Sequence, residues 1–301
     1  MIDATGVFLA GPTAVGKSEI ALALAAKFGG EIISVDSMQV YRGLDIGTAK
    51  PDAETQRKIP HHLIDVCDLT ETFDAGEFVQ LANQAVAEIR PRNKIPIFCG
   101  GTGLYFKAFL DGLGDAPQAD PQLRAELEAT PLAPLLEELR KNDPEAYAKI
   151  DLKNRRRVIR AVEVIRTTGK PLAASRADWE NKQDAKGPAL ILCVRSSGDL
   201  RHRIDSRVDF MFQRGLVDET RELLKHGLSE NRTAMQAIGY RQVVDHLRGE
   251  RNLAETIELV KIRTRQFAKR QLTWFRRHAQ CKKVELKPEE TVKEILERLS
   301  L

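Results

Sequence analysis

The residues best suited to chemistry begin at Gly11, where the segment GPTAVGKS follows a short apolar run. The segment matches the P-loop pattern G-x-x-x-x-G-K-[ST], and we call it the P-loop. Its glycines let backbone N–H groups converge on an anion, the Lys17 ammonium adds a positive charge, and the Ser18 hydroxyl is able to bind Mg²⁺. The pattern therefore predicts a di- or triphosphate site formed by Gly11, Pro12, Thr13, Ala14, Val15, Gly16, Lys17 and Ser18. It does not specify ATP.

Two further segments carry polar residues at the ends of apolar runs. Asp36 follows EIISV, where a carboxylate is able to bind Mg²⁺, act as a general base, or cap the N-terminus of a helix. The segment IFCGGTG places glycines and Thr102 where an ordinary NTPase carries an acidic residue at a strand end. These glycines count against a motor ATPase, and a tight strand-helix turn is the alternative explanation for them.

Arginines gather in the segment NRRRVIRAVEVIR, from Asn154 to Arg166. At helical spacing, Val158 and Ile159 face inward and the arginines form a basic face. Such a face is either a solvated surface or a contact with the backbone of a nucleic acid, and the near absence of acidic residues favours the nucleic acid.

Basic residues recur towards the end of the chain. Arg203 and Arg207 lie one helical turn apart, so each is placed either to reach a pyrophosphate or to pair with Asp205 or Asp209. Residues 261–283 contain no acid, which favours a polyanionic partner. The apolar residues in that stretch are alternatively part of a core: Ile262, Phe267, Leu272 and Phe275.

Strands and helices alternate in the first third of the chain. Strands are predicted at residues 7–10, 31–35, 95–99 and 189–194, and helices at 17–28 and 75–90. This alternation predicts an α/β fold, a P-loop NTPase-like parallel sheet flanked by helices, with ligands at the carboxyl ends of the strands. The P-loop, Asp36 and the Gly100–Gly103 turn all follow predicted strands, so we expect them to line one cleft.

A Gly-, Pro- and Asp-rich stretch after Asp111 marks a boundary, and residues 121–176 are predicted to be helical. We therefore expect an all-helical insertion at 115–186 in a core formed by 1–114 and 187–301. A short strand at KKVEL and a helix are predicted to close the chain.

Composition favours a soluble cytoplasmic protein. The chain has 301 residues, 42% of them hydrophobic, and a net charge of +4. No segment has the length of a membrane span or the pattern of a signal peptide. The four scattered cysteines are expected to be free thiols, and a structural role is expected for His61 and His62.

The motifs together resemble the tRNA dimethylallyltransferase family. They occur in order from Gly11 to about Phe275: the P-loop, DSMQVY, DIGTAKP, PHHLID, GGTGLY, RRVIRAVEV and AIGYRQ. The ordered set is more specific than any one motif after the P-loop. The chain lacks the C-terminal zinc-finger extension of eukaryotic members, so we expect a bacterial-type enzyme.

The resemblance implies transfer of a dimethylallyl group from its diphosphate to N6 of adenosine 37, beside the tRNA anticodon. Asp36 would accept the proton, Arg207 and Lys17 would stabilise the diphosphate, Thr102 would orient the flipped base, and Mg²⁺ would lie near Ser18. The residues implied to contact the tRNA anticodon stem-loop are Asp36, Ser37, Met38, Gln39, Thr102, Arg124, Arg156, Arg157, Val158, Ile159, Arg160, Gln236, Ala237, Ile238, Gly239, Tyr240 and Arg241. A monomer is expected.

Three alternatives use the same P-loop. A nucleotide or small-molecule kinase has no use for basic patches in three regions. An RNA-binding nucleotide switch requires a strand-end carboxylate and a γ-phosphate sensor, and the sequence shows neither. An isopentenyltransferase acting on free adenine nucleotides needs neither the insertion nor the basic helices.

Overall fold

The computed structural model of the chain describes residues 6–113, 117, 120–172 and 190–298. The chain divides into two compact units, one formed by Met1–Leu110 with Gly187–Leu301 and the other by Asp111–Lys186. We call them the core unit and the insertion unit and describe each by itself. The insertion unit begins slightly ahead of the expected residue 115.

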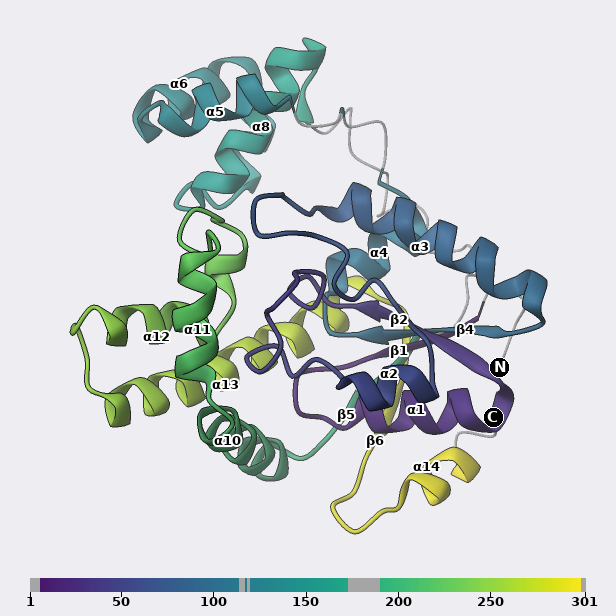
Figure 1. Cartoon of the computed structure of the whole chain (residues 1–301). Helices are drawn as coiled ribbons and strands as arrows, with labels where there is room; N and C mark the ends of the chain where they lie inside the picture. The colour runs from purple at the N-terminus through teal and green to yellow at the C-terminus, as the bar shows by residue number, and fades with distance from the viewer. Residues whose placement is uncertain (1–5, 114–116, 118–119, 173–189, 299–301) are drawn as a thin grey trace. The chain divides into compact units, whose positions relative to one another are not determined.

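The core unit is built on a parallel sheet, six-stranded in the part that the structure describes (Figure 1). The strands are β1 (Val7–Ala10), β2 (Gly30–Val35), β3 (His61–His62), β4 (Ile95–Gly100), β5 (Leu190–Val194) and β6 (Cys281–Glu285). Their order is β3-β2-β4-β1-β5-β6, and all paired strands are parallel. The carboxyl ends of β1, β2 and β4 are therefore adjacent at one edge of the sheet.

Alternate residues of the strands enter two separate cores. Phe8 and Phe98 face the core covered by α3 (Ala75–Ile89) and α4 (Gly103–Asp111), and their rings stack with centroids 4.6 Å apart. Leu9 and Ile97 face the core covered by α1 (Lys17–Phe28) and α14 (Val292–Arg298). Figure 1 shows these two pairs of helices on opposite sides of the sheet. Burial on both faces explains the continuous apolar runs of these strands.

The helices after β5 extend both cores. They are α10 (Ser197–Gln213), α11 (Leu216–Lys225), η3 (Ala234–Gln236), α12 (Tyr240–Leu247) and α13 (Leu253–His278). Leu200 and Ile204 of α10 join the core that α1 and α14 cover, whereas the buried residues of the later helices mainly join the core that α3 and α4 cover. The long α13 begins at a capping box formed by Asn252 and Glu255, and Phe275 near its other end is fully buried. Two short elements, α2 (Ala53–Lys58) and η1 (Arg90–Arg92), complete the described core unit.

The insertion unit consists of helices in its described part: α5 (Pro121–Ala129), α6 (Leu132–Asn142), α7 (Pro144–Lys149) and α8 (Arg155–Thr168). It has its own apolar core, in which Val158, Ile159 and Val162 of α8 meet Leu135 and Leu139 of α6. The unit therefore has the internal packing of a separate folding unit.

The predicted α/β class and the order of its main elements are confirmed. Residue 189 of the strand predicted at 189–194 lies outside the described residues. The helix predicted at 75–90 ends at Ile89, just before a 3₁₀ turn at Arg90–Arg92. The strand β3 was not predicted, because two residues are too few for an alternating pattern. None of the described helices has both the length and the apolar character that crossing a membrane requires.

Candidate active site

The P-loop connects β1 to α1 at the carboxyl edge of the sheet. The N–H of Gly11 donates to the carbonyl of Gly100 at 3.3 Å, which joins the start of the loop to the end of β4. α1 begins at Lys17, so its unpaired N–H groups and the positive end of its dipole lie at the loop. This is the geometry of an anion-binding site.

Two arginines hold the P-loop through its carbonyl groups. Nε of Arg195 donates to the carbonyl of Val15 at 2.7 Å, and Nε of Arg203 donates to the carbonyl of Ala14 at 2.9 Å. The C=O and N–H of a peptide unit point in opposite directions. These bonds therefore set the directions of the N–H groups of Val15 and Gly16.

Arg207 approaches a side chain of the P-loop rather than a carbonyl group. Its Nη1 is 3.5 Å from Oγ1 of Thr13. Burial, and then the charge of Arg203, lower the pKa of its guanidinium below its ordinary value. An anion at this position would relieve both penalties, so Arg207 is placed to stabilise negative charge at the P-loop.

The alternative that Arg203 and Arg207 pair with the acids of their own helix is wrong. Asp205 pairs with Arg265 at 2.9 Å, and Asp209 pairs with Lys261 at 2.8 Å. Both acids are thus engaged by α13, and the two arginines face the P-loop.

Lys17 lies within reach of the P-loop backbone, and its Nζ donates to the carbonyl of Pro12 at 3.4 Å. Burial lowers the pKa of its ammonium from 10.5, Arg207 adds to this effect, and Asp36 opposes it. Burial also raises the pKa of the neighbouring Cys99 thiol to about 11, so that thiol is neutral at neutral pH. Lys17 is therefore the basic group that the loop itself places at the predicted phosphate site, where an anion would favour its charged form.

Asp36 follows β2, and it caps a turn rather than a helix. Its Oδ1 accepts from the N–H of Met38 at 2.8 Å and of Gln39 at 3.3 Å, which stabilises the turn. Its Oδ2 makes no hydrogen bond with the described residues. One oxygen thus positions the carboxylate, and the other remains able to accept a proton.

Thr102 is joined to the turn that carries Asp36. Its Oγ1 accepts from the N–H of Ser37 at 3.2 Å, and its own N–H donates to the carbonyl of Val35 at 3.1 Å. The ends of β2 and β4 are thereby linked, and the structure brings Asp36, Thr102 and the P-loop to one edge of the sheet as predicted.

The glycines of the Gly100–Gly103 turn are explained by close packing. A Cβ on Gly103 would lie 2.1 Å from the ring of Trp274, which belongs to α13. A Cβ on Gly100 would lie 2.0 Å from the carbonyl oxygen of Val35. No side chain fits at either position, so the turn requires glycine because of its neighbours.

Residues from DIGTAKP are anchored to the helices after β5. A carboxylate oxygen of Glu219 accepts from the N–H of Ile46 at 2.9 Å, and the hydroxyl of Tyr240 donates to Glu219 at 2.6 Å. A Cβ on Gly47 would lie 2.5 Å from the Tyr240 ring. This network positions the loop that follows Asp36.

Lys50 joins DIGTAKP to PHHLID. Its buried Nζ pairs with Asp45 at 2.6 Å and with Asp65 at 2.5 Å. In the same region, His62 bonds the buried Glu31 at 2.8 Å, and His61 bonds the carbonyl of Ile59 at 2.7 Å. These contacts assign the histidines to the structure of the loop.

The residues implied to contact tRNA in the core unit differ in how far they are exposed. Gln236 and Arg241 are exposed, whereas the Tyr240 side chain is fully buried. The amide of Gln39 accepts from Oγ of Ser34 at 2.9 Å and donates to the carbonyl of Thr48 at 3.1 Å. The side chains of Tyr240 and Gln39 therefore have a structural role in the site.

The residues of the insertion unit that are implied to contact tRNA also differ in how far they are exposed. Arg156 and Arg157 are exposed, whereas the side chains of Val158 and Ile159 are part of the core and are not accessible to a partner. The expectation that these two side chains contact tRNA does not fit their placement, because helical periodicity turns them away from the arginine face.

Two other implied tRNA contacts in the insertion unit are held by one acid. Glu163 is fully buried and accepts from Nε of Arg124 at 2.8 Å and from Nη1 of Arg160 at 2.6 Å. An unpaired buried carboxylate would be costly, so Arg124 and Arg160 have a structural role whatever else they contact.

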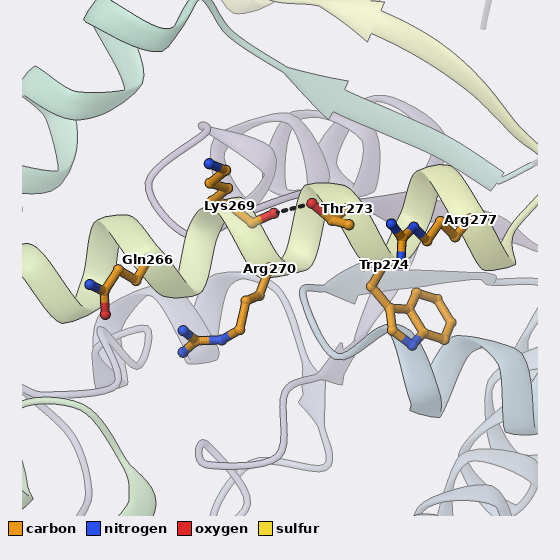
Figure 2. Close-up of a pocket in the computed structure, with 6 residues that line it drawn as sticks. All are labelled: Gln266, Lys269, Arg270, Thr273, Trp274 and Arg277. Atoms are coloured by element: carbon orange, nitrogen blue, oxygen red, sulfur yellow. Dashed lines mark hydrogen bonds between the residues drawn. The ribbon is translucent and has the colours of Figure 1, made fainter. Parts of the chain in front are cut away.

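The surface of α13 is hollowed into a pocket of about 430 Å³. Figure 2 shows Gln266, Arg270 and Trp274 on the same side of the helix. Lys269, Thr273 and Arg277 complete the lining. Three cations beside an indole ring suit a phosphate and a stacked base. The exposed Phe267 and Ile262 are not core residues, in contrast to the buried Phe275.

Sequence reasoning missed three residues of the site: Arg195, Glu219 and Gln271. Arg195 directly follows β5, so the rule that ligands lie at strand ends would have identified it. Glu219 and Gln271 act on segments far away in the sequence, and no local pattern reports such contacts.

Comparison with known proteins identifies the family. A family model described as IPP transferase matches residues 39–278. The tRNA dimethylallyltransferase 1 of Trichlorobacter lovleyi is 50% identical over 273 residues, which cover 89% of this chain and 89% of the relative.

Solved structures agree with this result. The tRNA isopentenylpyrophosphate transferase from Bacillus halodurans is 41% identical, covers 98% of this chain and 94% of its own, and has a TM-score of 0.71. A eukaryotic dimethylallyltransferase acting on tRNA is 28% identical, with a TM-score of 0.82 over 98% of this chain and 77% of its own. The chain therefore belongs to the IPP transferase family.

Proposed function

We propose that this protein transfers the dimethylallyl group of dimethylallyl diphosphate to N6 of adenosine 37 in tRNA. The observation that carries the proposal is the meeting of the P-loop with Asp36 and Thr102 at one edge of the sheet. A diphosphate site therefore lies beside a carboxylate and a hydroxyl that are suited to an acceptor. The relatives named above act on tRNA, which supports tRNA as the acceptor.

The P-loop residues Gly11–Ser18 hold the diphosphate through their N–H groups. During transfer the bond between the allylic carbon and the diphosphate oxygen breaks, and the electron pair leaves with the diphosphate. Lys17 and Arg207 stabilise the negative charge that develops there. The P-loop thus acts on a leaving group rather than on a phosphate that is transferred.

The acceptor nitrogen forms the new bond to the allylic carbon, and its proton passes to Asp36. The N6 amine is a weak nucleophile, so a carboxylate held in hydrogen-bond distance assists its attack. Thr102 orients the base. Because the adenine is stacked in the anticodon loop, it must be flipped into the site at a cost of a few kcal/mol.

The residues of the P-loop fit a magnesium ion. No group of three or more His, Cys, Asp or Glu side chains in the described ranges is arranged to hold a metal by itself. Mg²⁺ does not need such a group, because it keeps several waters and binds substrate phosphates. The exposed Ser18 at the start of α1 would contribute a hydroxyl ligand, and the ion would supply further charge neutralisation to the diphosphate.

The tRNA contacts are drawn from exposed basic residues in both units. We assign Arg156 and Arg157 of the insertion unit and Arg241 of the core unit to contacts with the anticodon stem-loop. The pocket on α13 is assigned to the same partner. Because the site is complete within one chain, we propose that the protein acts as a monomer.

The test is a transfer assay with labelled dimethylallyl diphosphate, Mg²⁺ and tRNA that lacks the modification. Label in tRNA at adenosine 37 is expected. AMP, ADP and ATP are compared as acceptors, and label in free nucleotides alone would contradict the proposal. ATP consumption with no transfer of label would favour a kinase.

A further inference from the structure

Gln271 of α13 lies between the P-loop and the Gly100–Gly103 turn. Its side chain is nearly buried, and its amide makes two hydrogen bonds to backbone groups distant in the sequence. Oε1 accepts from the N–H of Thr13 at 3.0 Å, and Nε2 donates to the carbonyl of Gly101 at 2.9 Å. A backbone N–H on one side and a carbonyl on the other determine the orientation of the amide.

The fit around this amide is close. A Cβ on Gly101 would lie 2.2 Å from Nε2 of Gln271, so the turn approaches the amide as nearly as its backbone allows. Loss of the amide would leave the N–H of Thr13 and the carbonyl of Gly101 without these partners. Without these two hydrogen bonds, the separation between the P-loop and the Gly100–Gly103 turn would change.

The two segments serve different substrates in the proposed reaction. Thr13 belongs to the loop assigned to the diphosphate. Gly101 precedes Thr102, whose hydroxyl bonds Ser37 beside the proposed base Asp36. A single planar amide thus spans the distance between the leaving-group side and the acceptor side of the site.

We propose that Gln271 is a positioning residue that sets the spacing between the diphosphate and the acceptor base. The inference rests on the function proposed above. Gln271 touches neither reacting group and acts through Thr13 and Gly101. We expect Gln271 to affect the rate of transfer, because a misalignment of the reacting groups by about 1 Å is able to lower the rate about 100-fold.

The first test replaces the amide with a side chain of similar size that makes no hydrogen bonds. Q271L is expected to lower kcat by about 10- to 100-fold and to leave the KM for tRNA within about 2-fold. Thr264→Ala is the matched control, because Oγ1 of Thr264 bonds the carbonyl of Val260 in the same helix. Wild-type kcat in folded Q271L would overturn the proposal.

The second test uses pH to restore both hydrogen bonds. The carboxyl group of Q271E, when protonated, accepts from Thr13 and donates to Gly101 as the amide does, whereas the carboxylate cannot donate. Burial raises the pKa of such a carboxyl, so protonation falls in an accessible range. Transfer by Q271E relative to wild type is expected to rise as pH falls, and to exceed that of Q271L. Equal activity of Q271E and Q271L at low pH would contradict the proposal.

A third measurement is independent of transfer. Amide hydrogen exchange with inorganic diphosphate and Mg²⁺ is expected to show protection at both the P-loop and residues 100–105 in wild type. In Q271L the protection is expected only at the P-loop. Protection of both segments in Q271L would overturn the coupling. A wild-type protein that shows this coupling but does not modify tRNA would contradict the proposed function, whereas the coupling of the two segments through Gln271 would still hold.

Discussion

Asp36 uses one carboxylate oxygen to hold its own turn and leaves the other for chemistry. Its Oδ1 accepts from the N–H groups of Met38 and Gln39, and this arrangement points the carboxyl group in one direction without help from another side chain. A general base is effective only when its approach to the proton is fixed. The turn therefore orients the carboxylate that would act as the base.

Asp36→Asn separates the two roles. The amide oxygen still accepts from the turn, so we expect thermal stability and tRNA binding to stay near wild type. The transfer rate is expected to fall by about 100- to 10,000-fold, because the amide cannot take a proton. Asp36→Ala is the comparison, and it is expected also to lower stability by about 1 kcal/mol through loss of the turn. Transfer at the wild-type rate by D36N would exclude Asp36 as the base.

Arg207 and Arg203 are expected to differ in their effect on the stability of the folded protein. Arg207 is a partly buried cation beside another cation, so Arg207→Ala is expected to leave the melting temperature unchanged or slightly higher. Its Kd for inorganic diphosphate is expected to rise by about 10- to 100-fold, the loss of one charge-assisted hydrogen bond.

Arg203→Ala is expected to lower the melting temperature, because it removes the bond to the carbonyl of Ala14. Calorimetric titration with diphosphate and thermal unfolding of both variants provide the check. A larger loss of stability in R207A than in R203A would reverse the assignment.

At the level of elements, the loop after β2 depends on α11 and α12. Glu219 accepts from the N–H of Ile46 and from the hydroxyl of Tyr240, and Gly47 packs against the Tyr240 ring. Asp36 lies at the start of this loop. The position of the proposed base therefore depends on helices that contain no proposed catalytic residue.

Glu219 gives this connection a pH dependence. Burial raises the pKa of its carboxyl from 4.5, while hydrogen bonds from Tyr240, Ile46 and Gly47 lower it by less. The folded protein then binds more protons than the unfolded chain between pH 4.5 and the raised pKa. The contribution of Glu219 to the free energy of unfolding is therefore full below pH 4.5 and decreases as pH rises through the raised pKa.

Glu219→Gln removes this titration and keeps an acceptor for Ile46. The stability of E219Q relative to wild type is expected to increase as pH rises across that window. Urea unfolding at a series of pH values measures the difference. Parallel curves for the two proteins would show that Glu219 does not titrate there.

Local sequence patterns predicted the strands and helices that apolar runs define. They did not predict contacts between residues that are far apart in the sequence. The strands β1, β2 and β4 were predicted because buried parallel strands are apolar throughout. The place of Asp36 and Thr102 followed from the strand-end rule. By contrast, the bond from Gln271 to Thr13 joins residues 258 positions apart, and nothing near either residue reports it. The sequence also allowed Arg207 to pair with Asp209, but in the structure Asp209 pairs with Lys261 of α13.

At the scale of the whole molecule, basic residues serve two purposes. In the insertion unit, Arg166 pairs with Glu126 at 2.6 Å and with Glu138 at 2.8 Å, and Arg155 bonds carbonyls at the end of α5. Arg156 and Arg157 are exposed on the same helix. Charge count alone therefore overstates the surface offered to tRNA.

The double variant R156Q/R157Q is expected to weaken tRNA binding and to reduce the slope of log K against log salt by roughly 1.5 to 2. The Kd for diphosphate is expected to stay unchanged. R166Q is the matched control, since it breaks two ion pairs and is expected to lower stability without altering the salt slope. Equal salt slopes for R156Q/R157Q and wild type would place the tRNA elsewhere.

The order of the strands has a consequence for synthesis on the ribosome. β1 is made before the insertion unit, yet its neighbour β5 follows the whole insertion unit. At about 5 to 20 residues per second, the ribosome needs on the order of ten seconds to pass from β4 to β5. During that time one edge of β1 has no partner, and the arginines that hold the P-loop do not yet exist. The insertion unit has a core of its own with which to fold in that interval, so the nascent chain acquires a structured middle before its phosphate site is complete.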